Sequence, residues 1–217
     1  MTARRGPGRP RKSEEAKASE RASILGATRL AVEERGPEVS LDDIASAAGV
    51  SKPAIYSHFA DKAGLAEALA LELEGDLYEW SARRAAENDL HEAADLLRVG
   101  VDAFTRFMAE QTNLYRFIVR AMKGNGADVL DNALVPAFQG RITTIVARAY
   151  PDLDPDVRET AAFALLGQVF TACEAWLGHR RFPRQQLVEL LVELFTGGLP
   201  ALAGPQSETV LISRHSR

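Results

Sequence analysis

Residues 39–65 read VSLDDIASAAGVSKPAIYSHFADKAGL, and this stretch predicts two short helices joined by a tight turn. Ser40 suits the N-cap of the first helix, because its hydroxyl can accept a hydrogen bond from a backbone N–H of the first turn. Apolar residues then recur at helical spacing, which indicates one buried face. Gly49 ends this helix, since glycine tolerates the left-handed backbone conformation needed there.

A second short helix begins immediately after the turn. Ser51 is its expected N-cap, and Pro53 lies in the first turn, where a missing N–H costs no hydrogen bond. Ile55 and Phe59 are four residues apart and face inward. Two short helices with a glycine-containing turn are typical of the helix-turn-helix, whose second helix enters the major groove of DNA. A helical hairpin that binds nothing would show the same local pattern and is the alternative.

The same segment resembles the N-terminal domain of the tetracycline-repressor (TetR) family. The resemblance is carried by the runs SLDDIASAAGVS, AIYSHF and DKAGL, and the Y-x-H-F element followed by Lys62 is its most specific part. It covers roughly residues 18–66, and the rest of the chain matches only in length, helical character and placement. It implies an all-helical homodimer with an N-terminal DNA-binding domain and a C-terminal effector-binding domain.

The resemblance also implies which side chains contact DNA. Those on the reader face are Lys52, Pro53, Ala54 and Tyr56, and those at backbone-contacting positions are His58 and Lys62. Lys52 can reach guanine O6/N7 or a phosphate, and Tyr56 and Lys62 can donate to phosphates. Ser40 can contact a phosphate through its hydroxyl or through N–H groups at the helix start. For His58, a packing role inside the domain is the alternative.

The distribution of charge favours DNA binding at the N-terminal end. The net charge is −4, but residues 1–62 hold 11 Lys and Arg against 9 Asp and Glu. Phosphate contact is local, so this asymmetry matters more than the total.

The first twelve residues form a basic arm that contains the tetrapeptide GRPR, which resembles the core of an AT-hook. So much proline and glycine prevents the arm from folding alone. We expect Arg9 and Arg11 to enter the minor groove of A·T-rich DNA, where the negative potential is deep. A nonspecific electrostatic tail is the alternative.

Composition favours an all-α chain. It has 217 residues with 46% hydrophobic content, and it lacks long β-branched runs. No apolar run reaches the ~18 residues that span a bilayer, and no apolar secretory segment follows the basic N-terminus. We therefore expect no membrane association and a cytoplasmic location, on the nucleoid when the protein is bound to DNA. The single cysteine, Cys173, excludes an internal disulfide and is expected to be a small buried hydrophobe.

The sequence holds no motif for catalysis or metal binding. Its four histidines are scattered, and it has no phosphate-cradling loop, nucleophile elbow or HExxH motif. We expect no enzymatic activity, no cofactor and no metal.

Hydrophobic periodicity and helix stop signals predict about nine helices. They cover roughly 13–36, 41–48, 52–58, 62–87, 91–109, 113–122, 127–149, 155–178 and 183–202. Asp61 caps the long fourth helix, and Pro136 should kink the seventh. The predicted organisation is a disordered basic arm over 1–12, a DNA-binding domain over 13–60, an effector-binding and dimerisation domain over 61–203, and a disordered tail over 204–217.

The last two long helices are more apolar than a single buried side requires. The family resemblance pairs helices 155–178 and 183–202 with their copies in a homodimer. The expected interface residues are Ala161, Gly167, Leu187, Leu191 and Leu194. Simple burial within one protomer is the alternative.

An effector pocket for a mostly apolar small molecule is expected among the helices of residues 80–180. Its aromatic and sulfur-containing lining is predicted to be Trp80, Phe104, Phe107, Met108, Tyr115, Phe117, Phe138, Phe170, Cys173 and Trp176, and its polar groups Gln168, Glu174 and Arg120. Plain core packing is the alternative for each of them.

These features together predict a sequence-specific DNA-binding transcriptional regulator. The simplest version is a repressor that binds a near-palindromic operator as a homodimer and is released by a small-molecule effector of unknown identity. The alternatives are an architectural DNA-binding protein with an AT-hook-like arm and a transcriptional activator of the same fold.

Overall fold

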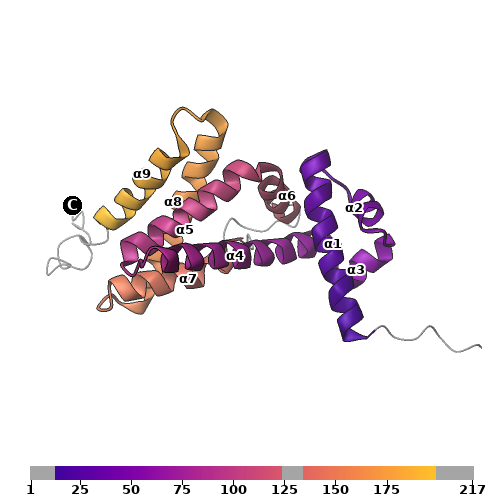
Figure 1. Ribbon diagram of the computed structural model, residues 1–217, viewed down its shortest axis with the longest axis horizontal. Helices are drawn as coiled ribbons and strands as arrows, with labels where there is room; N and C mark the ends of the chain where they lie inside the picture. Colours follow the sequence, from indigo (N-terminus) through magenta and orange to yellow (C-terminus); the bar gives the residue numbers. More distant parts are fainter. Residues whose placement is uncertain (1–12, 124–133, 199–217) are drawn as a thin grey trace, which may run out of the picture.

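The computed structural model describes residues 13–123 and 134–198, and every regular element within them is an α-helix (Figure 1). The helices are α1 Glu14–Arg35, α2 Leu41–Ala48, α3 Lys52–Phe59, α4 Lys62–Glu87, α5 Ala93–Glu110, α6 Thr112–Lys123, α7 Leu134–Ala149, α8 Pro155–His179 and α9 Arg184–Gly198. The predicted all-α class is confirmed.

The long helix α4 joins the two ends of the molecule. Figure 1 shows α1 standing across one end of α4, with α2 and α3 on the far side of α1. From there α4 runs along α5 and α7, while α7 packs on α8 and α5 packs on α9. Helix α6 contacts both α1 and α4, so it lies in the angle between the N-terminal helices and the rest.

The chemistry at the helix ends explains the short N-terminal helices. Ser40 and Asp43 form a reciprocal capping box at the start of α2, and Gly49 ends α2 with a φ of +66°. Ser51 occupies the N-cap position of α3, but its side chain makes no cap hydrogen bond. Asp61 caps α4 through a 2.8 Å bond from the backbone N–H of Gly64.

One apolar core runs from the N-terminal helices into the C-terminal part. Ile24 of α1, Ile55 of α3, Leu69 of α4 and Phe117 of α6 are all fully buried in it. Leu30 of α1 lies outside this core, because its side chain is 61% exposed.

Two of the predicted helices are described only in part. Helix α7 is described from Leu134 and helix α9 as far as Gly198, so the predicted start of the first, the predicted end of the second and the predicted kink at Pro136 stay predictions. The basic arm, the start of the expected 127–149 helix, and all residues after 198 lie outside the described part of the chain.

Helix α8 is apolar enough, over a sufficient length, to cross a membrane by composition alone, contrary to the expectation from apolar runs. It is the one such helix among the described residues, and core helices of soluble proteins pass the same test. Ala162, Leu165 and Cys173 of α8 are buried against neighbouring helices, which is the packing of a core helix.

Candidate DNA-binding surface and effector cavity

Helix α3 presents one face to the core and the other to solvent. Ile55 and Phe59 are buried, whereas Pro53, Tyr56 and Ser57 are exposed. The exposed face therefore carries a hydroxyl donor at Tyr56 that is free to reach a phosphate. Ala54 is half-buried and contributes only its methyl group to this surface.

The ammonium of Lys52 is held by a carboxylate of the neighbouring helix. Its Nζ lies 2.9 Å from an oxygen of Asp42, in the first turn of α2, and both side chains are accessible to solvent. This contact raises the pKa of Lys52, because the carboxylate stabilises the charged form. Lys52 must leave Asp42 to contact a guanine or a phosphate.

Ser40 is exposed, but its hydroxyl is committed to the cap of α2. It accepts a hydrogen bond from the backbone N–H of Asp43, and it donates to the Asp43 carboxylate. The Ser40 hydroxyl and the Ser40 backbone N–H both donate to the Asp43 carboxylate and lower its pKa, with a smaller contribution from Arg35 at 2.7 Å.

The structure directs the two backbone-contacting candidates inward. His58 is 11% exposed, and its Nε2 lies 2.9 Å from a carboxylate oxygen of Glu20 on α1. This placement fits the alternative given for His58, a packing role inside the domain. Lys62 donates from Nζ to the carbonyl of Val39 at 2.7 Å, and it lies 5.0 Å from the ring centroid of Phe117. Burial lowers the pKa of Lys62. Both side chains are half-buried, and contact of His58 and Lys62 with the DNA backbone stays a prediction.

Two residues near the reader helix were given no role by the sequence reasoning. Arg21 of α1 is exposed and lies 5.1 Å from the ring centroid of Phe59, at the end of α3. Gly64 lies so close to the chain before it that an added Cβ would meet the Phe59 carbonyl oxygen at 2.1 Å. The close approach at Gly64 could have been predicted from the glycine in the DKAGL run. Arg9 and Arg11 lie outside the described residues.

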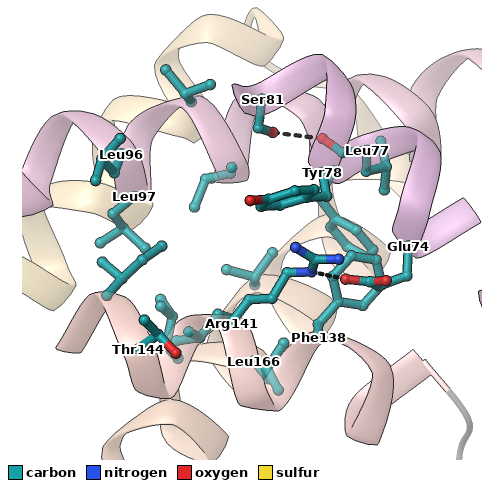
Figure 2. Close-up of a pocket in the computed structure, with 18 of the residues that line it drawn as sticks. Glu74, Leu77, Tyr78, Ser81, Leu96, Leu97, Phe138, Arg141, Thr144 and Leu166 are labelled. Atoms are coloured by element: carbon teal, nitrogen blue, oxygen red, sulfur yellow. Dashed lines mark hydrogen bonds and ion pairs between the residues drawn. The ribbon is translucent and has the colours of Figure 1, made fainter. Parts of the chain in front are cut away.

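A cavity of about 510 Å³ opens among α4, α5, α7 and α8 (Figure 2). Its deeper wall is aromatic and aliphatic. Phe104 lies edge-on to Phe170 with ring centroids 4.7 Å apart, and edge-on to Phe138 at 5.6 Å. Leu97, Leu165 and other aliphatic side chains complete this apolar lining.

One wall of the cavity carries an ion pair between two helices. Figure 2 shows Arg141 of α7 reaching across to Glu74 of α4, beneath the ring of Tyr78. The Arg141 guanidinium lies 3.5 Å from the Tyr78 ring centroid, and its Nε donates to the Glu74 carboxylate. Glu74 is only 14% exposed, and its charge raises the pKa of Arg141. Charged groups therefore converge beside an apolar chamber.

The cavity brings together three of the ten residues predicted to line an effector pocket. They are Phe104, Phe138 and Phe170. The seven residues that do not line it are Trp80, Phe107, Met108, Tyr115, Phe117, Cys173 and Trp176. Trp80 lies on another side of α4, 6.0 Å from Arg106, and the other six are buried in the core.

The predicted polar groups also lie elsewhere. Gln168 donates to the carbonyl of Leu191, Glu174 bonds to Tyr115, and Arg120 pairs with Glu38. Burial raises the pKa of Cys173 to about 12, so its thiol is an inert packing group, as expected.

Residues 24–69 match the family described as bacterial regulatory proteins, tetR family. An uncharacterized HTH-type transcriptional regulator of Mycobacterium tuberculosis is 25% identical over 190 residues, which cover 86% of this chain and 80% of that protein.

Solved structures show the same fold. A tetR-family transcriptional regulator from Streptomyces coelicolor matches with a TM-score of 0.64 at 24% identity, covering 88% of this chain and 85% of that one. The regulator FadR from Bacillus subtilis, in complex with stearoyl-CoA, matches with a TM-score of 0.59 at 17% identity, covering 82% and 98%. The helix-turn-helix, the family match over it and the shared fold agree. Residues 24–69 thus form a DNA-binding domain of the tetR family, and the chain is similar over most of its length to HTH-type transcriptional regulators of the same fold.

Proposed function

We propose that this regulator is a repressor that binds a near-palindromic operator as a homodimer and releases it when a small molecule occupies the cavity. One observation carries the proposal: α4 takes part in both sites. Its capped start contacts the helix-turn-helix, and one of its faces between Glu74 and Ala85 lines the cavity. The protein can adopt conformations that differ in the position of α4 and therefore of the helix-turn-helix. A ligand that binds one of these conformations more tightly will increase its population.

Helix α6 gives the coupling a second route. Phe117 of α6 lies against Lys62, and Arg120 pairs with Glu38, which precedes α2. A displacement of α4 relative to α6 must therefore strain contacts that position the helix-turn-helix. A swing of α4 about one end would change the distance between the α3 helices of the two protomers. Binding to a two-fold operator requires this distance to be about 34–36 Å.

The dimer interface that we propose differs in residues from the sequence-based set. Ala161, Leu187 and Leu191 are buried inside one protomer and do not face a partner. Gly167 of α8 is exposed, and Leu194 of α9 is 58% exposed. Leu190 and Leu194 are four residues apart and share one exposed apolar face of α9, and we propose that this face and Gly167 of α8 pair with a second copy.

The effector is a small molecule held by the cavity rather than by the buried aromatic cluster around Phe117. The volume lies in the range of small-molecule sites, and the apolar lining with a few charged groups is typical of them. The stearoyl-CoA complex of FadR supports this, because a neighbour with the same fold holds a small molecule.

Selection of bound genomic fragments by the purified full chain, at near-physiological salt, tests the proposal. We expect one short near-palindromic motif, whose neighbouring genes give the reporter for repression. Increased transcription from that promoter on adding the protein would establish an activator instead.

The architectural alternative rests on the GRPR arm. Binding spread over A·T-rich DNA without any motif would favour it. For the proposed repressor we place the boundary between the DNA-binding and effector domains at residues 60/61, and its site of action in the cytoplasm on the nucleoid.

A further inference from the structure

We infer that the effector is an amphiphile with a single anionic head group, held between Arg141 and Arg148 while its apolar tail lies over Phe104. This inference rests on the proposed function, because it names the chemical class for the same cavity. It is drawn from the charges and faces of the helices that form the cavity wall.

The charged side chains of the cavity carry a net positive charge. They are Glu74, Arg141 and Arg148, so one carboxylate stands against two guanidinium groups. Arg148 is exposed, and no carboxylate among the described residues forms an ion pair with it. An anion entering here therefore meets a field that favours it.

The two arginines lie on one face of α7. They are seven residues apart, which is two helical turns or roughly 10 Å along the axis. Thr144 and Ile145 lie between them on the same face and also line the cavity. Two long side chains at this spacing can converge on one head group, and guanidinium is suited to bind a carboxylate through two parallel hydrogen bonds.

The structure already contains one carboxylate bound at this place. The Glu74 carboxylate accepts a hydrogen bond from the Arg141 guanidinium. The centroid of the Tyr78 ring lies 3.5 Å from the same guanidinium. An anionic ligand would exchange with Glu74, whereas a cationic ligand would have to separate Glu74 from Arg141 and then face two arginines. The geometry thus favours the anion over the cation.

The apolar part of the cavity lining selects for an apolar tail. Phe104 lies edge to face with both Phe138 and Phe170, and the cavity-lining residues of α5 and α8 around them are mostly aliphatic. A tail placed there is removed from water, while the head stays at the charged wall.

The same exchange of carboxylates would also transmit ligand binding from the cavity to the helix-turn-helix. The Glu74–Arg141 pair ties α4 to α7. When a ligand takes Arg141, Glu74 is left largely buried without its partner, which is costly. A position of α4 that exposes Glu74 to water is then favoured. Because α4 begins beside the helix-turn-helix, this shift of α4 also moves the DNA-binding helices.

The test compares three ligands with the same ten-carbon tail: decanoate, decan-1-ol and decyltrimethylammonium. Binding to the full chain is measured by titration calorimetry. We expect decanoate to bind at least about tenfold more tightly than decan-1-ol, because only the carboxylate accepts charge-assisted hydrogen bonds from the two arginines. Equal affinity of the two, or tighter binding of decyltrimethylammonium, would overturn the anionic class.

Three variants locate the head group. Arg141→Gln and Arg148→Gln should each weaken decanoate about tenfold without changing decan-1-ol, whereas Arg116→Gln on the exposed side of α6 should change neither. Glu74→Gln should tighten decanoate and weaken decyltrimethylammonium. These opposite shifts remain decisive if an arginine variant folds poorly, and shifts of the same sign would contradict the inference.

Ser81→Trp separates this inference from the proposed function. Ser81 lines the cavity, and its hydroxyl bonds only to its own helix, at the Leu77 carbonyl. The indole should block all three ligands, and retained binding would overturn both proposals. If decanoate binds as described but leaves operator affinity unchanged, the chemical class stands and the effector function fails.

Discussion

The ammonium of Lys62 lies 2.7 Å from the carbonyl oxygen of Val39, and this hydrogen bond joins the start of α4 to the segment that enters α2. The same ammonium lies 5.0 Å from the centroid of the Phe117 ring on α6. Lys62 therefore connects three parts of the chain at the point where the reader helices meet the effector domain. A phosphate contact would require it to abandon these partners.

Lys62→Met should lower the free energy of unfolding by about 1 kcal/mol, because a half-buried carbonyl loses its donor. The slope of log affinity against log salt should stay unchanged, since no phosphate contact is removed. Chemical denaturation and salt-dependent DNA binding measure the two quantities. Lys17→Met, at an exposed pair with Glu14, is the control for stability. A slope reduced by about one, with stability unchanged, would return Lys62 to the DNA surface.

The stability contributed by Lys62 should depend on pH. Burial lowers its pKa below 10.5, so the unfolded chain binds this proton more strongly than the folded protein. Stability rises with pH wherever the unfolded state holds more protons. Between the lowered pKa and pH 10.5, the wild-type protein should therefore gain stability relative to Lys62→Met. Denaturation of both proteins across this range measures the difference, and a relative loss would contradict the placement.

Asp42→Asn should raise DNA affinity roughly two- to fivefold. The 2.9 Å pair with Lys52 no longer has to be broken, and the gain is small because an exposed ion pair of this kind is weak. Fluorescence anisotropy with a labelled operator measures the change. Asp152→Asn, which removes an exposed charge far along the chain, should have no effect. The gain should vanish in the double variant with Lys52→Met, and its persistence there would exclude Lys52 as the group responsible.

Gly64→Ala should destabilise the protein by roughly 1–3 kcal/mol, because the new methyl group would lie 2.1 Å from the Phe59 carbonyl oxygen and the backbone would have to move. Gly75→Ala, in the same helix with open space around it, should instead stabilise by about 0.5–1 kcal/mol. Thermal unfolding of the two variants gives the comparison. The same sign for both would show that the close approach is not limiting.

Leu194→Lys should turn the dimer into a monomer at micromolar concentration while leaving the protomer folded, since this side chain is 58% exposed. Sedimentation velocity follows the association. Leu30→Lys changes an equally exposed leucine on α1 and should leave the dimer intact. A dimer that survives Leu194→Lys would place the interface elsewhere.

Removal of residues 1–12 should weaken binding more on operators with A·T-rich flanks than on those with G·C-rich flanks, if Arg9 and Arg11 enter the minor groove. The affinities of the full chain and the truncated chain for both kinds of operator, measured at one salt concentration, give the two losses to be compared. An equal loss on both flanks would indicate a nonspecific electrostatic tail.

The local elements could be predicted from sequence because their causes lie within a few consecutive residues. The Ser40–Asp43 capping box, the left-handed Gly49 and the Asp61 cap each involve neighbours along the chain, so the bounds of α2 and the start of α4 were correct. The outward Tyr56 and inward Phe59 of α3 follow from the same helical period.

The cavity could not be predicted in this way. A helix that contacts both core and cavity shows one apolar pattern for both, so periodicity did not separate Phe104, which lines the cavity, from Phe107, which is buried beside it.

The sequence by itself determined the helix-turn-helix, the all-helical class and the match of residues 24–69 to the tetR family. The tertiary structure alone decided that Lys62 points inward, that Leu187 is core while Leu194 is surface, and that Arg141 meets Glu74. Glu74 and Arg141 are 67 residues apart in the chain. Contacts at such separation depend on how whole helices pack, and no local pattern of residues encodes them.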